Sequence, residues 1–231
     1  MAVTASPAPA LPLVVRRLGS VPYEAGLAMQ QALVEDRRAG RIPDTLLLLE
    51  HPPVITLGVR TRGQVSNIVA SAEELETRGV EVFETGRGGD VTYHGPGQLV
   101  GYPILDLRPD RCDVHQYVRD LEEALLVAVR RFGVSATRVV GLTGVWVGPP
   151  GREEKLAAIG VRISRWITSH GFALNVATDL RNFKLIVPCG IADRGVTSLD
   201  RLTGRQVPMT EVEEAVSDAF GAVFGRTTSS S

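Results

Sequence analysis

Two side chains in this sequence have the chemistry of a nucleophile and an activating cation. Cys189 stands in Pro188-Cys-Gly190, where the proline fixes the backbone and the glycine leaves room for a ligand beside the sulfur. Lys155 opens the apolar run Leu156-Ala-Ala-Ile-Gly160. If the fold brings the two together, the ammonium favours the thiolate, which is the nucleophilic form of cysteine. Two ordinary interpretations stay open: a buried structural cysteine and a solvated lysine.

Lysine is scarce in this chain, which draws further notice to Lys155. Lysine and arginine together number 25, yet the lysines are only Lys155 and Lys184. Arginine does not release its proton in a protein, whereas lysine does when its surroundings are tuned. A lysine in a chain that otherwise uses arginine is therefore a candidate for proton chemistry.

The stretch from Gly86 to Tyr102 has the composition of a binding loop. Glycine stands at positions 86, 88, 89, 95, 97 and 101, and the side chains between them are mostly polar. Glycine lets a backbone turn sharply and approach a ligand closely, and a polar loop that feeds a core strand is a common form of small-molecule site. No phosphate-loop pattern follows it. A plain hairpin with flexible turns is the alternative.

Other candidate residues carry weaker signals. Cys112 precedes a helix start, but its charged neighbours indicate an exposed turn, so it ranks below Cys189. The histidines at positions 51, 94, 115 and 170 lack zinc-ligand spacing, so no metal site is predicted. No Gly-x-Ser-x-Gly elbow indicates a serine hydrolase.

Composition limits the class of protein. The chain has 231 residues, 44% of them hydrophobic and 5% aromatic, which predicts one globular domain, or two small ones, with an aliphatic core. A net charge of −1 gives no support to nucleic-acid binding, and no apolar run is long enough for a membrane span. Without a secretion-signal pattern, a reducing cytoplasm is expected, and a disulfide between the two cysteines is not.

The elements that must position these residues alternate between strands and helices. Hydrophobic patterning predicts helices over 23–38, 72–79, 113–133 and 210–223, with Asp113 and Thr210 as N-caps. It predicts strands over 13–17, 45–50, 54–58, 80–84 and 99–107, two strands around a turn at Gly141 within 138–147, and a hairpin of 155–163 with 166–176 turned near Ser164-Arg165. We expect disordered tails at 1–12 and 226–231 around one catalytic domain at 13–225. The order of elements indicates an α/β (α+β) domain with a mixed central sheet flanked by helices.

Taken in order, the motifs resemble the lipoyl(octanoyl) transferase (LipB) family over residues 13–224. The matching stretches are Glu50-His-Pro-Pro-Val-Ile-Thr56, Arg87-Gly-Gly-Asp-Val-Thr-Tyr-His-Gly-Pro-Gly-Gln-Leu-Val-Gly-Tyr102, Lys155-Leu-Ala-Ala-Ile-Gly160, His170-Gly-Phe-Ala-Leu-Asn-Val176 and Pro188-Cys-Gly190. Phe172 departs from the leucine common in the family, which bears on the shape of the pocket. The resemblance implies the fold of biotin and lipoate ligases.

The resemblance also implies an activity and its partners. Members move an octanoyl group from acyl-carrier protein to a lysine of a lipoyl domain, through a cysteine thioester, with no cofactor and no metal. The acceptors are lipoyl domains of 2-oxoacid dehydrogenase E2 subunits and the glycine cleavage H protein. Neither nucleic acid nor a membrane takes part.

Carried over by position, the resemblance assigns roles to residues of this chain. Cys189 becomes the nucleophile and Lys155 the residue that lowers the pKa of its thiol. The implied substrate-binding residues are Arg87, Gly88, Gly89, Asp90, Val91, Thr92, Tyr93, His94, Ala158, Ile159, Gly160, Gly171, Phe172 and Ala173.

Two other functions use the same features. An ATP-dependent ligase of the lipoate or biotin type has a glycine loop and a lysine, and it needs no cysteine. A non-catalytic module that binds an acyl group or its carrier would show affinity without turnover. The Pro-Cys-Gly motif argues against the first, and the cysteine–lysine pair against the second.

Overall fold

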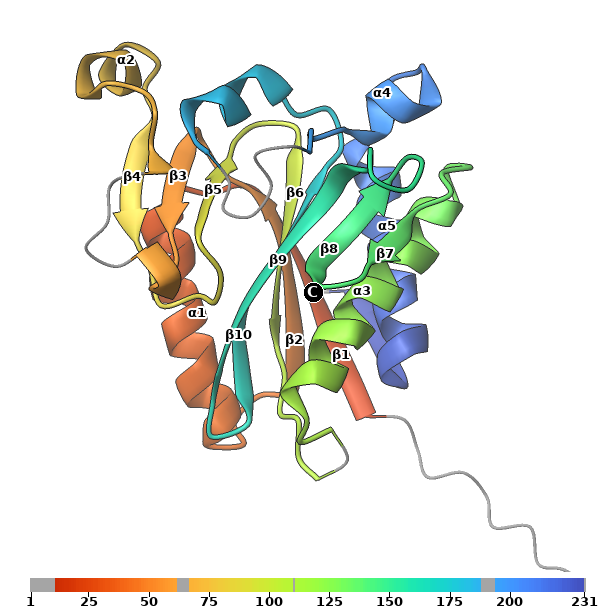
Figure 1. Ribbon diagram of the computed structural model, residues 1–231. Coiled ribbons are helices and arrows are strands. Elements are labelled where there is room, and N and C mark those ends of the chain that lie inside the picture. The colour runs from red at the N-terminus through yellow and green to blue at the C-terminus, as the bar shows by residue number, and fades with distance from the viewer. Residues whose placement is uncertain (1–10, 62–66, 110, 188–193, 231) are drawn as a thin grey trace, which may run out of the picture.

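The computed structural model describes residues 11–61, 67–109, 111–187 and 194–230, and it places two sheets side by side (Figure 1). The larger sheet is mixed and has the strand order β11-β1-β2-β6-β10-β9-β8-β7. Its strands β1 and β2 run parallel, as do β1 and β11, and the remaining pairs are antiparallel. The strands are β1 (Leu11–Ser20), β2 (Asp44–Glu50), β6 (Gln98–Ile104), β7 (Thr137–Val139), β8 (Leu142–Val147), β9 (Glu154–Ser164), β10 (Ile167–Asn175) and β11 (Arg226–Ser230).

Helices cover both faces of this sheet (Figure 1). On one side lies α1 (Tyr23–Arg38), and on the other lie α3 (Val114–Arg130) and α5 (Met209–Phe224). The run of leucines in β2 follows from this arrangement. Leu46 and Leu48 point into the core under α3 and α5, whereas Leu47 and Leu49 point into the core under α1. A strand buried on both faces is apolar throughout rather than alternating.

The second sheet is small and carries part of the glycine-rich stretch. It consists of β3 (Val54–Leu57) between β4 (Glu81–Glu84) and β5 (Val91–His94), with its own apolar core around Ile55. The short helices are α2 (Ala72–Thr77), α4 (Leu199–Thr203) and the 3-10 turns η1 (Val59–Thr61) and η3 (Leu180–Leu185). Part of the expected loop is thus a strand, because residues Val91–His94 form β5 and pair with β3.

The turn between β9 and β10 comes one residue later than expected. Ser164 pairs with Ile167, so the two turn residues are Arg165 and Trp166, with φ of 53° and 67°. Positive φ at both central positions defines the type I′ turn, whose twist matches that of paired strands. Strand β9, which carries Lys155, is thus paired with β10 from this turn as far as Ala157 and Leu174.

Helix starts follow the expected residues in one case and differ in another. The Asp113 carboxylate caps α3 by accepting the N–H groups of His115 and Gln116. The expected Thr210 cap of α5 is wrong, because the helix starts at Met209 with Pro208 before it and no side-chain cap. Proline tolerates this place, since the first backbone N–H groups of a helix have no intrahelical partner.

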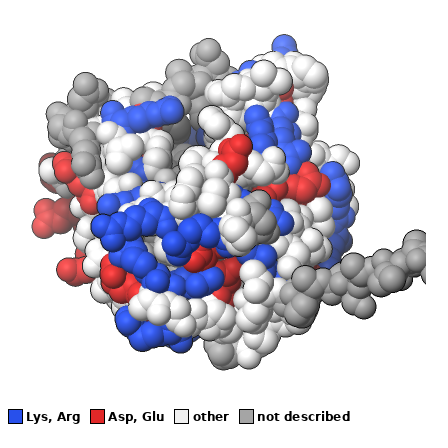
Figure 2. Space-filling view, turned by 90° about the horizontal axis from the view of Figure 1, so that it is seen from below, with Lys and Arg blue, Asp and Glu red and all other residues white. Residues whose placement is uncertain are grey.

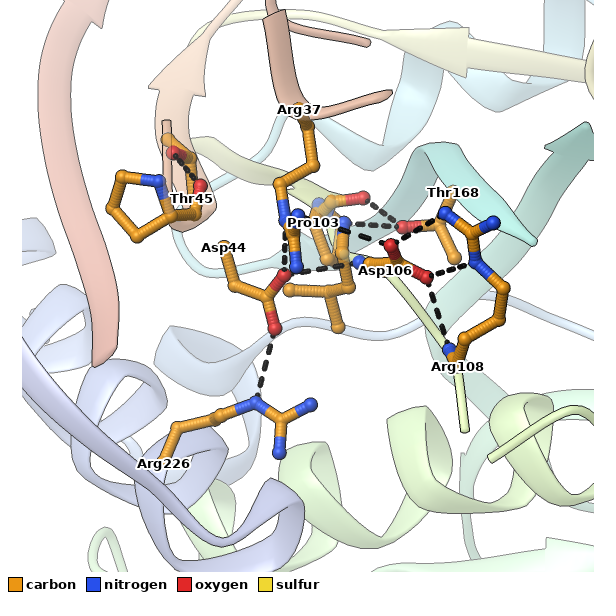
Figure 3. Close-up of polar contacts among 10 residues, drawn as sticks. Arg37, Asp44, Thr45, Pro103, Asp106, Arg108, Thr168 and Arg226 are labelled. Carbon is orange, nitrogen blue, oxygen red and sulfur yellow. Dashed lines mark hydrogen bonds and ion pairs between the residues drawn. The ribbon is translucent and has the colours of Figure 1, made fainter. Parts of the chain in front are cut away.

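The C-terminal residues 226–230, expected to be a disordered tail, form the edge strand β11. Arg226 explains the difference, because its side chain is 4% exposed and its Nε lies 3.0 Å from Asp44 Oδ2. Asp44 also accepts the Nε of Arg37 at 2.8 Å and the N–H of Asp106 at 3.0 Å (Figure 3). The Asp44 carboxylate on β2 therefore holds β11, so the two strands that flank β1 are linked to each other. Residues 1–10 lie outside the described residues.

Arginines gather at the lower end of the molecule, with carboxylates beside several of them (Figure 2). Arg38, Arg41 and Arg108 each pair with a nearby carboxylate, at 2.6 to 2.8 Å. Exposed pairs of this kind contribute little stability, because water screens them. The buried pair of Asp44 with Arg226 is different, since loss of one partner leaves a charge in the interior.

Replacing Asp44 by alanine is expected to lower the free energy of unfolding by about 3–5 kcal/mol, because Arg37 and Arg226 lose their shared carboxylate. Urea unfolding followed by circular dichroism measures the change. The matched control is Asp36→Ala, which removes an exposed pair with Arg41 and should change stability by at most ~0.5 kcal/mol. Equal effects from the two variants would contradict this account of β11.

Candidate active site

A cavity of about 570 Å³ lies where the small sheet meets β9, β10 and α3. Its volume falls within the range of small-molecule sites. The expected residues that line it are Arg87, Gly88, Gly89, Asp90, Val91, Thr92, His94, Lys155, Ala158, Ile159, Gly160, Gly171, Phe172 and Ala173. Segments that are far apart in the sequence thus share one cavity.

The glycine loop lies directly on strand β9. Gly88 donates its N–H to the carbonyl of Val161 at 2.9 Å. A Cβ on Gly160 would stand 2.8 Å from the carbonyl oxygen of Gly88. Real Cβ atoms do not approach backbone this closely, so glycine at position 160 is what lets the loop reach the strand. The cavity wall is therefore backbone against backbone.

Arg87 is a buried cation that holds the loop in shape. Its Nη2 donates to the Thr56 carbonyl at 2.7 Å and to the Asp90 carbonyl at 2.5 Å. Its Nε donates to the hydroxyl of Thr56 at 3.1 Å. Burial lowers the pKa of the guanidinium, although arginine keeps its proton in proteins. Arg87 therefore brings positive charge to the cavity.

A bulge in β9 turns Lys155 toward this cavity. Val145 pairs with Ala157 and the next residue, Trp146, pairs with Lys155, so Leu156 is an extra residue on β9. Both Leu156 and Ala157 are buried in the main core. In a regular strand Lys155 would lie on the same face as Ala157, which is the core face. The bulge places Lys155 on the opposite face, toward the cavity. The strand period alone would have sent this lysine into the core.

A third segment, residues 195–197, pairs with the backbone of Lys155. Its N–H donates to the Gly195 carbonyl at 2.9 Å, and its carbonyl accepts the Thr197 N–H at 3.0 Å. Asn175, at the end of β10, donates from Nδ2 to the Thr197 carbonyl at 3.0 Å. Residues 195–197 therefore lie between β9 and β10 where these strands part, and Arg194, Gly195 and Val196 line the cavity.

The ammonium of Lys155 is in an apolar environment. Its Nζ lies 4.7 Å from the ring centroid of Trp146. Burial lowers the pKa of Lys155 to about 8. A group with this pKa gives and takes a proton near neutral pH, as a general acid or base must.

Cys189 and its neighbours Pro188 and Gly190 lie outside the described residues. The described residues on either side are fixed to the site. Before it, Val187 donates its N–H to the carbonyl of Asn67 at 2.8 Å, and the Asn67 side chain donates to Asp90. After it, Gly195 pairs with Lys155. The chain therefore enters this segment near the glycine loop and leaves it beside Lys155. The other thiol, Cys112, is free and exposed.

A hydrogen-bonded chain runs beneath the cavity from the glycine stretch to residue 197. His94 Nδ1 lies 2.7 Å from Gln98 Oε1, and Gln98 Nε2 donates to Asn175 Oδ1 at 3.0 Å. Because the amide of Gln98 presents its oxygen to His94, Nδ1 of that histidine carries the proton. Asn175 then reaches the Thr197 carbonyl. These hydrogen bonds fix the glycine stretch and residue 197 relative to each other.

Buried histidines surround this chain in their neutral form. Burial, aided by the charges of His51 and Arg87, lowers the pKa of His94 to about 3. Burial likewise lowers the pKa of His170 to about 4. His170 has a φ of 55°, in the left-handed region, and its N–H is held by Gln30 Oε1 at 2.7 Å. Such strain persists where the surroundings enforce it, and it is frequent at functional sites.

These histidines predict a loss of stability in mild acid. Their folded pKa values lie below the ordinary 6.5, so the unfolded chain binds more protons between about pH 4 and 6.5. Stability should be complete above pH 6.5 and fall as the pH drops toward 4, by up to about 1.4 kcal/mol per pH unit for each histidine. Urea unfolding at several pH values should show a shallower slope of stability against pH for His94→Gln than for the wild type. Identical slopes in the two proteins would contradict the assignment.

Tyr93 is the expected pocket residue that does not line the cavity. It alternates with Thr92 and His94 along β5, so its ring packs in the core of the small sheet and its hydroxyl accepts from Asn182 at 3.0 Å. Sequence reasoning also missed one wall, which α3 and the β7–β8 turn provide. Residues of that wall are Val114, Val118, Arg119, Glu122, Leu142 and Thr143. Polar residues on the otherwise apolar face of α3, Glu122 above all, were the available signal.

Two kinds of site are absent from the described part of the chain. No cluster of three or more His, Cys, Asp and Glu side chains there is placed to hold a metal ion. None of its helices combines the length and hydropathy needed to cross a bilayer.

Comparison with known proteins decides the family. The lipoyl protein ligase A/B catalytic domain matches residues 22–221. The chain belongs to this family. An octanoyltransferase from Acidobacterium capsulatum is 57% identical over 220 residues, which cover 90% of this chain and 88% of that protein. One from Myxococcus xanthus is 55% identical over 214 residues, 92% of this chain and 59% of that longer protein, so the chain spans less than two thirds of that relative.

Solved structures confirm the predicted fold of the lipoyl protein ligase A/B family. A bipartite lipoate protein ligase from Thermoplasma acidophilum superposes with a TM-score of 0.68, over 97% of this chain and 87% of that one. Its sequence identity of 19% carries the fold alone. The octanoyltransferase relatives confirm the predicted resemblance and make this family member an acyltransferase that acts in lipoylation.

Proposed function

We propose that the chain transfers an octanoyl group from acyl-carrier protein to a lysine of a lipoyl domain, through a thioester on Cys189. The observation that carries the proposal is the buried Lys155, which has a pKa of about 8 and faces a cavity of about 570 Å³. Its backbone pairs with Gly195, a few residues after Cys189 in the chain. Proton chemistry near neutral pH, a cavity and a nearby thiol in the sequence are the components of covalent acyl transfer.

The cavity suits a medium acyl chain. Apolar side chains from three strands line it, among them Val100, Ile159 and Phe172. At about 0.8 kcal/mol for each buried CH₂, an octanoyl chain contributes on the order of 5 kcal/mol to binding. We assign the acyl chain to this apolar part and its carbonyl to the end beside Lys155.

The first half-reaction forms the acyl-enzyme. The Cys189 thiolate attacks the carbonyl carbon of the carrier thioester, a new carbon–sulfur bond forms, and the bond to the carrier sulfur breaks. The Lys155 ammonium stabilises the attacking thiolate and gives a proton to the departing carrier thiolate. The positive charges of Arg87 and Lys155 lower the energy of the oxyanion formed on the way.

The second half-reaction forms the amide. The neutral amine of the acceptor lysine attacks the same carbonyl carbon, a carbon–nitrogen bond forms, and the bond to the Cys189 sulfur breaks. The nitrogen loses one proton, which neutral Lys155 accepts, and the enzyme returns to its thiolate–ammonium form. The acceptors are lipoyl domains of E2 subunits and the H protein, and the reducing cytoplasm is the compartment in which such a thiol persists.

Intact-mass measurement tests the proposal. Incubation with octanoyl-carrier protein should add one octanoyl group to the chain, and peptide mapping should place it on Cys189 rather than Cys112. Hydroxylamine should release it, as expected of a thioester. The absence of an adduct would overturn the proposal, as would an adduct on Cys112. A requirement for ATP with release of pyrophosphate would indicate a ligase instead.

A further inference from the structure

Trp146, which the proposed reaction does not use, is a buried ring with two cations against it. Lys155 Nζ lies 4.7 Å from the ring centroid, and Arg194 Cζ lies 5.9 Å from it. The ring itself has no exposed surface. A cation over an aromatic face is attracted by the negative face of the ring, and more strongly where water is excluded.

The N–H of this indole is not what holds it in place. Within the described residues, Trp146 Nε1 is buried and has no hydrogen-bond partner. Most buried tryptophans place that group against an acceptor, so an orphaned one calls for an explanation. The polar contacts that the structure gives this indole are instead those of its ring face with the two cations.

Among the described residues, three carboxylates on the elements packed around Lys155 pair with arginines. Glu122 on α3 pairs with Arg119 and Arg138. Glu153 pairs with Arg194, and Glu154 on β9 lies 3.4 Å from Arg201. Lys155 makes no ion pair within the described residues. Within the described residues these carboxylates are therefore paired with arginines, and the Trp146 indole lies against the Lys155 ammonium.

We propose that Trp146 is a positioning residue for acyl transfer: its ring holds the Lys155 ammonium and the Arg194 guanidinium on one platform and offsets the cost of burying the lysine charge. The bulge at Leu156 supplies the geometry, because it sets Lys155 opposite Trp146 across β8 and β9. Trp146 thereby keeps Lys155 protonated near neutral pH while burial works against it. The consequence for catalysis, though not the contact itself, rests on the function proposed above.

The chain allows a direct measurement on Lys155. Its lysines are Lys155 and Lys184, so a sample with isotope-labelled lysine gives two side-chain signals in nuclear magnetic resonance. Lys184 is exposed and serves as the internal reference. The titration needs no substrate and no activity. Wild-type Lys155 should titrate at about 8.

Removal of the ring should lower the pKa of Lys155. In Trp146→Leu we expect a fall of about one unit, a tenfold change in acid dissociation, which is the size of a desolvated cation–π contact. Trp146→Phe should fall between the two, because phenylalanine has the weaker ring. The control Phe220→Leu alters a buried aromatic in the main core away from Lys155 and should leave its titration unchanged.

Fluorinated tryptophan tests the ring in a folded protein whose shape is unchanged. Trp166 is the other tryptophan, so the experiment uses a Trp166→Phe background. The pKa of Lys155 should fall stepwise as fluorine atoms withdraw charge from the indole face. A Lys155 pKa that stays constant across Trp146→Leu and the fluorinated series would overturn the proposal, and the fluorinated series decides alone if Trp146→Leu does not fold.

The activity measurement separates this inference from the proposed function. The alkaline limb of the pH profile of acyl-enzyme formation should move down with the pKa of Lys155 in each Trp146 variant. Failure of the wild type to form an adduct would overturn the proposed function and leave the titration result standing. A wild type that forms the adduct, with variants whose alkaline limb does not move, would overturn the role of Trp146 alone.

Discussion

Replacing Cys189 by serine is expected to lower the rate of octanoyl transfer on the order of 10³-fold or more, because a hydroxyl is far less ionised than a thiol at neutral pH. In the mechanism proposed above Cys189 takes part in both half-reactions, so its replacement removes both. The measurement is transfer to a lipoyl domain under single-turnover conditions, together with the intact mass of the protein.

The matched control for this variant is Cys112→Ser, which changes the other thiol of the chain. Cys112 is exposed, its sulfur contacts the Leu107 carbonyl, and it is not among the described residues that line the cavity. Cys112→Ser should keep wild-type transfer and the wild-type adduct. Retention of an octanoyl adduct by Cys189→Ser would instead point to a direct transfer without an acyl-enzyme.

Replacing Lys155 by methionine is expected to slow acyl-enzyme formation by about 10²-fold or more, which is the usual contribution of a positioned acid or base. Methionine keeps the length and the apolar stem of lysine, so packing against Trp146 is largely preserved. Loss of the ammonium raises the pKa of the Cys189 thiol, since the thiolate loses its nearby positive charge. Alkylation of Cys189 by iodoacetamide across a pH range measures that change.

Two further variants serve as comparisons for Lys155→Met. Lys155→Arg keeps the charge and cannot act as a base, so it should retain a lowered thiol pKa and still transfer the acyl group slowly. Lys184→Met removes the other, exposed lysine and should behave as the wild type. If Lys155→Met leaves the pH dependence of alkylation unchanged, Lys155 does not activate the thiol.

Much of the fold follows from local sequence signals. The helix over 23–38 has the predicted bounds, and the Asp113 cap is where its spacing to Gln116 indicated. Both signals are local, since a helix is set by residues three and four apart. β11 could not be predicted in this way, because the Arg226–Asp44 pair that fixes it joins opposite ends of the chain.

The site shows the same division between local and distant causes. The pocket residues that the sequence predicted line the cavity, except Tyr93, which the alternation of β5 turns into the core of the small sheet. The wall from α3 and the platform of Trp146 were missed. Both depend on packing between elements that are distant in the sequence. No spacing of residues along the chain predicts either of them.

The bulge at Leu156 makes this enzyme sensitive to the length of one short run of chain. Inserting one residue between Val145 and Trp146 on β8 would give Leu156 a partner, restore a regular alternation and aim the reactive amine at the aliphatic interior. Adding or removing residues in the neighbouring surface turn, at Gly148–Gly151, would leave that aim untouched. Engineers who wish to shorten or lengthen the protein should therefore work in the turn and preserve the count in the strand.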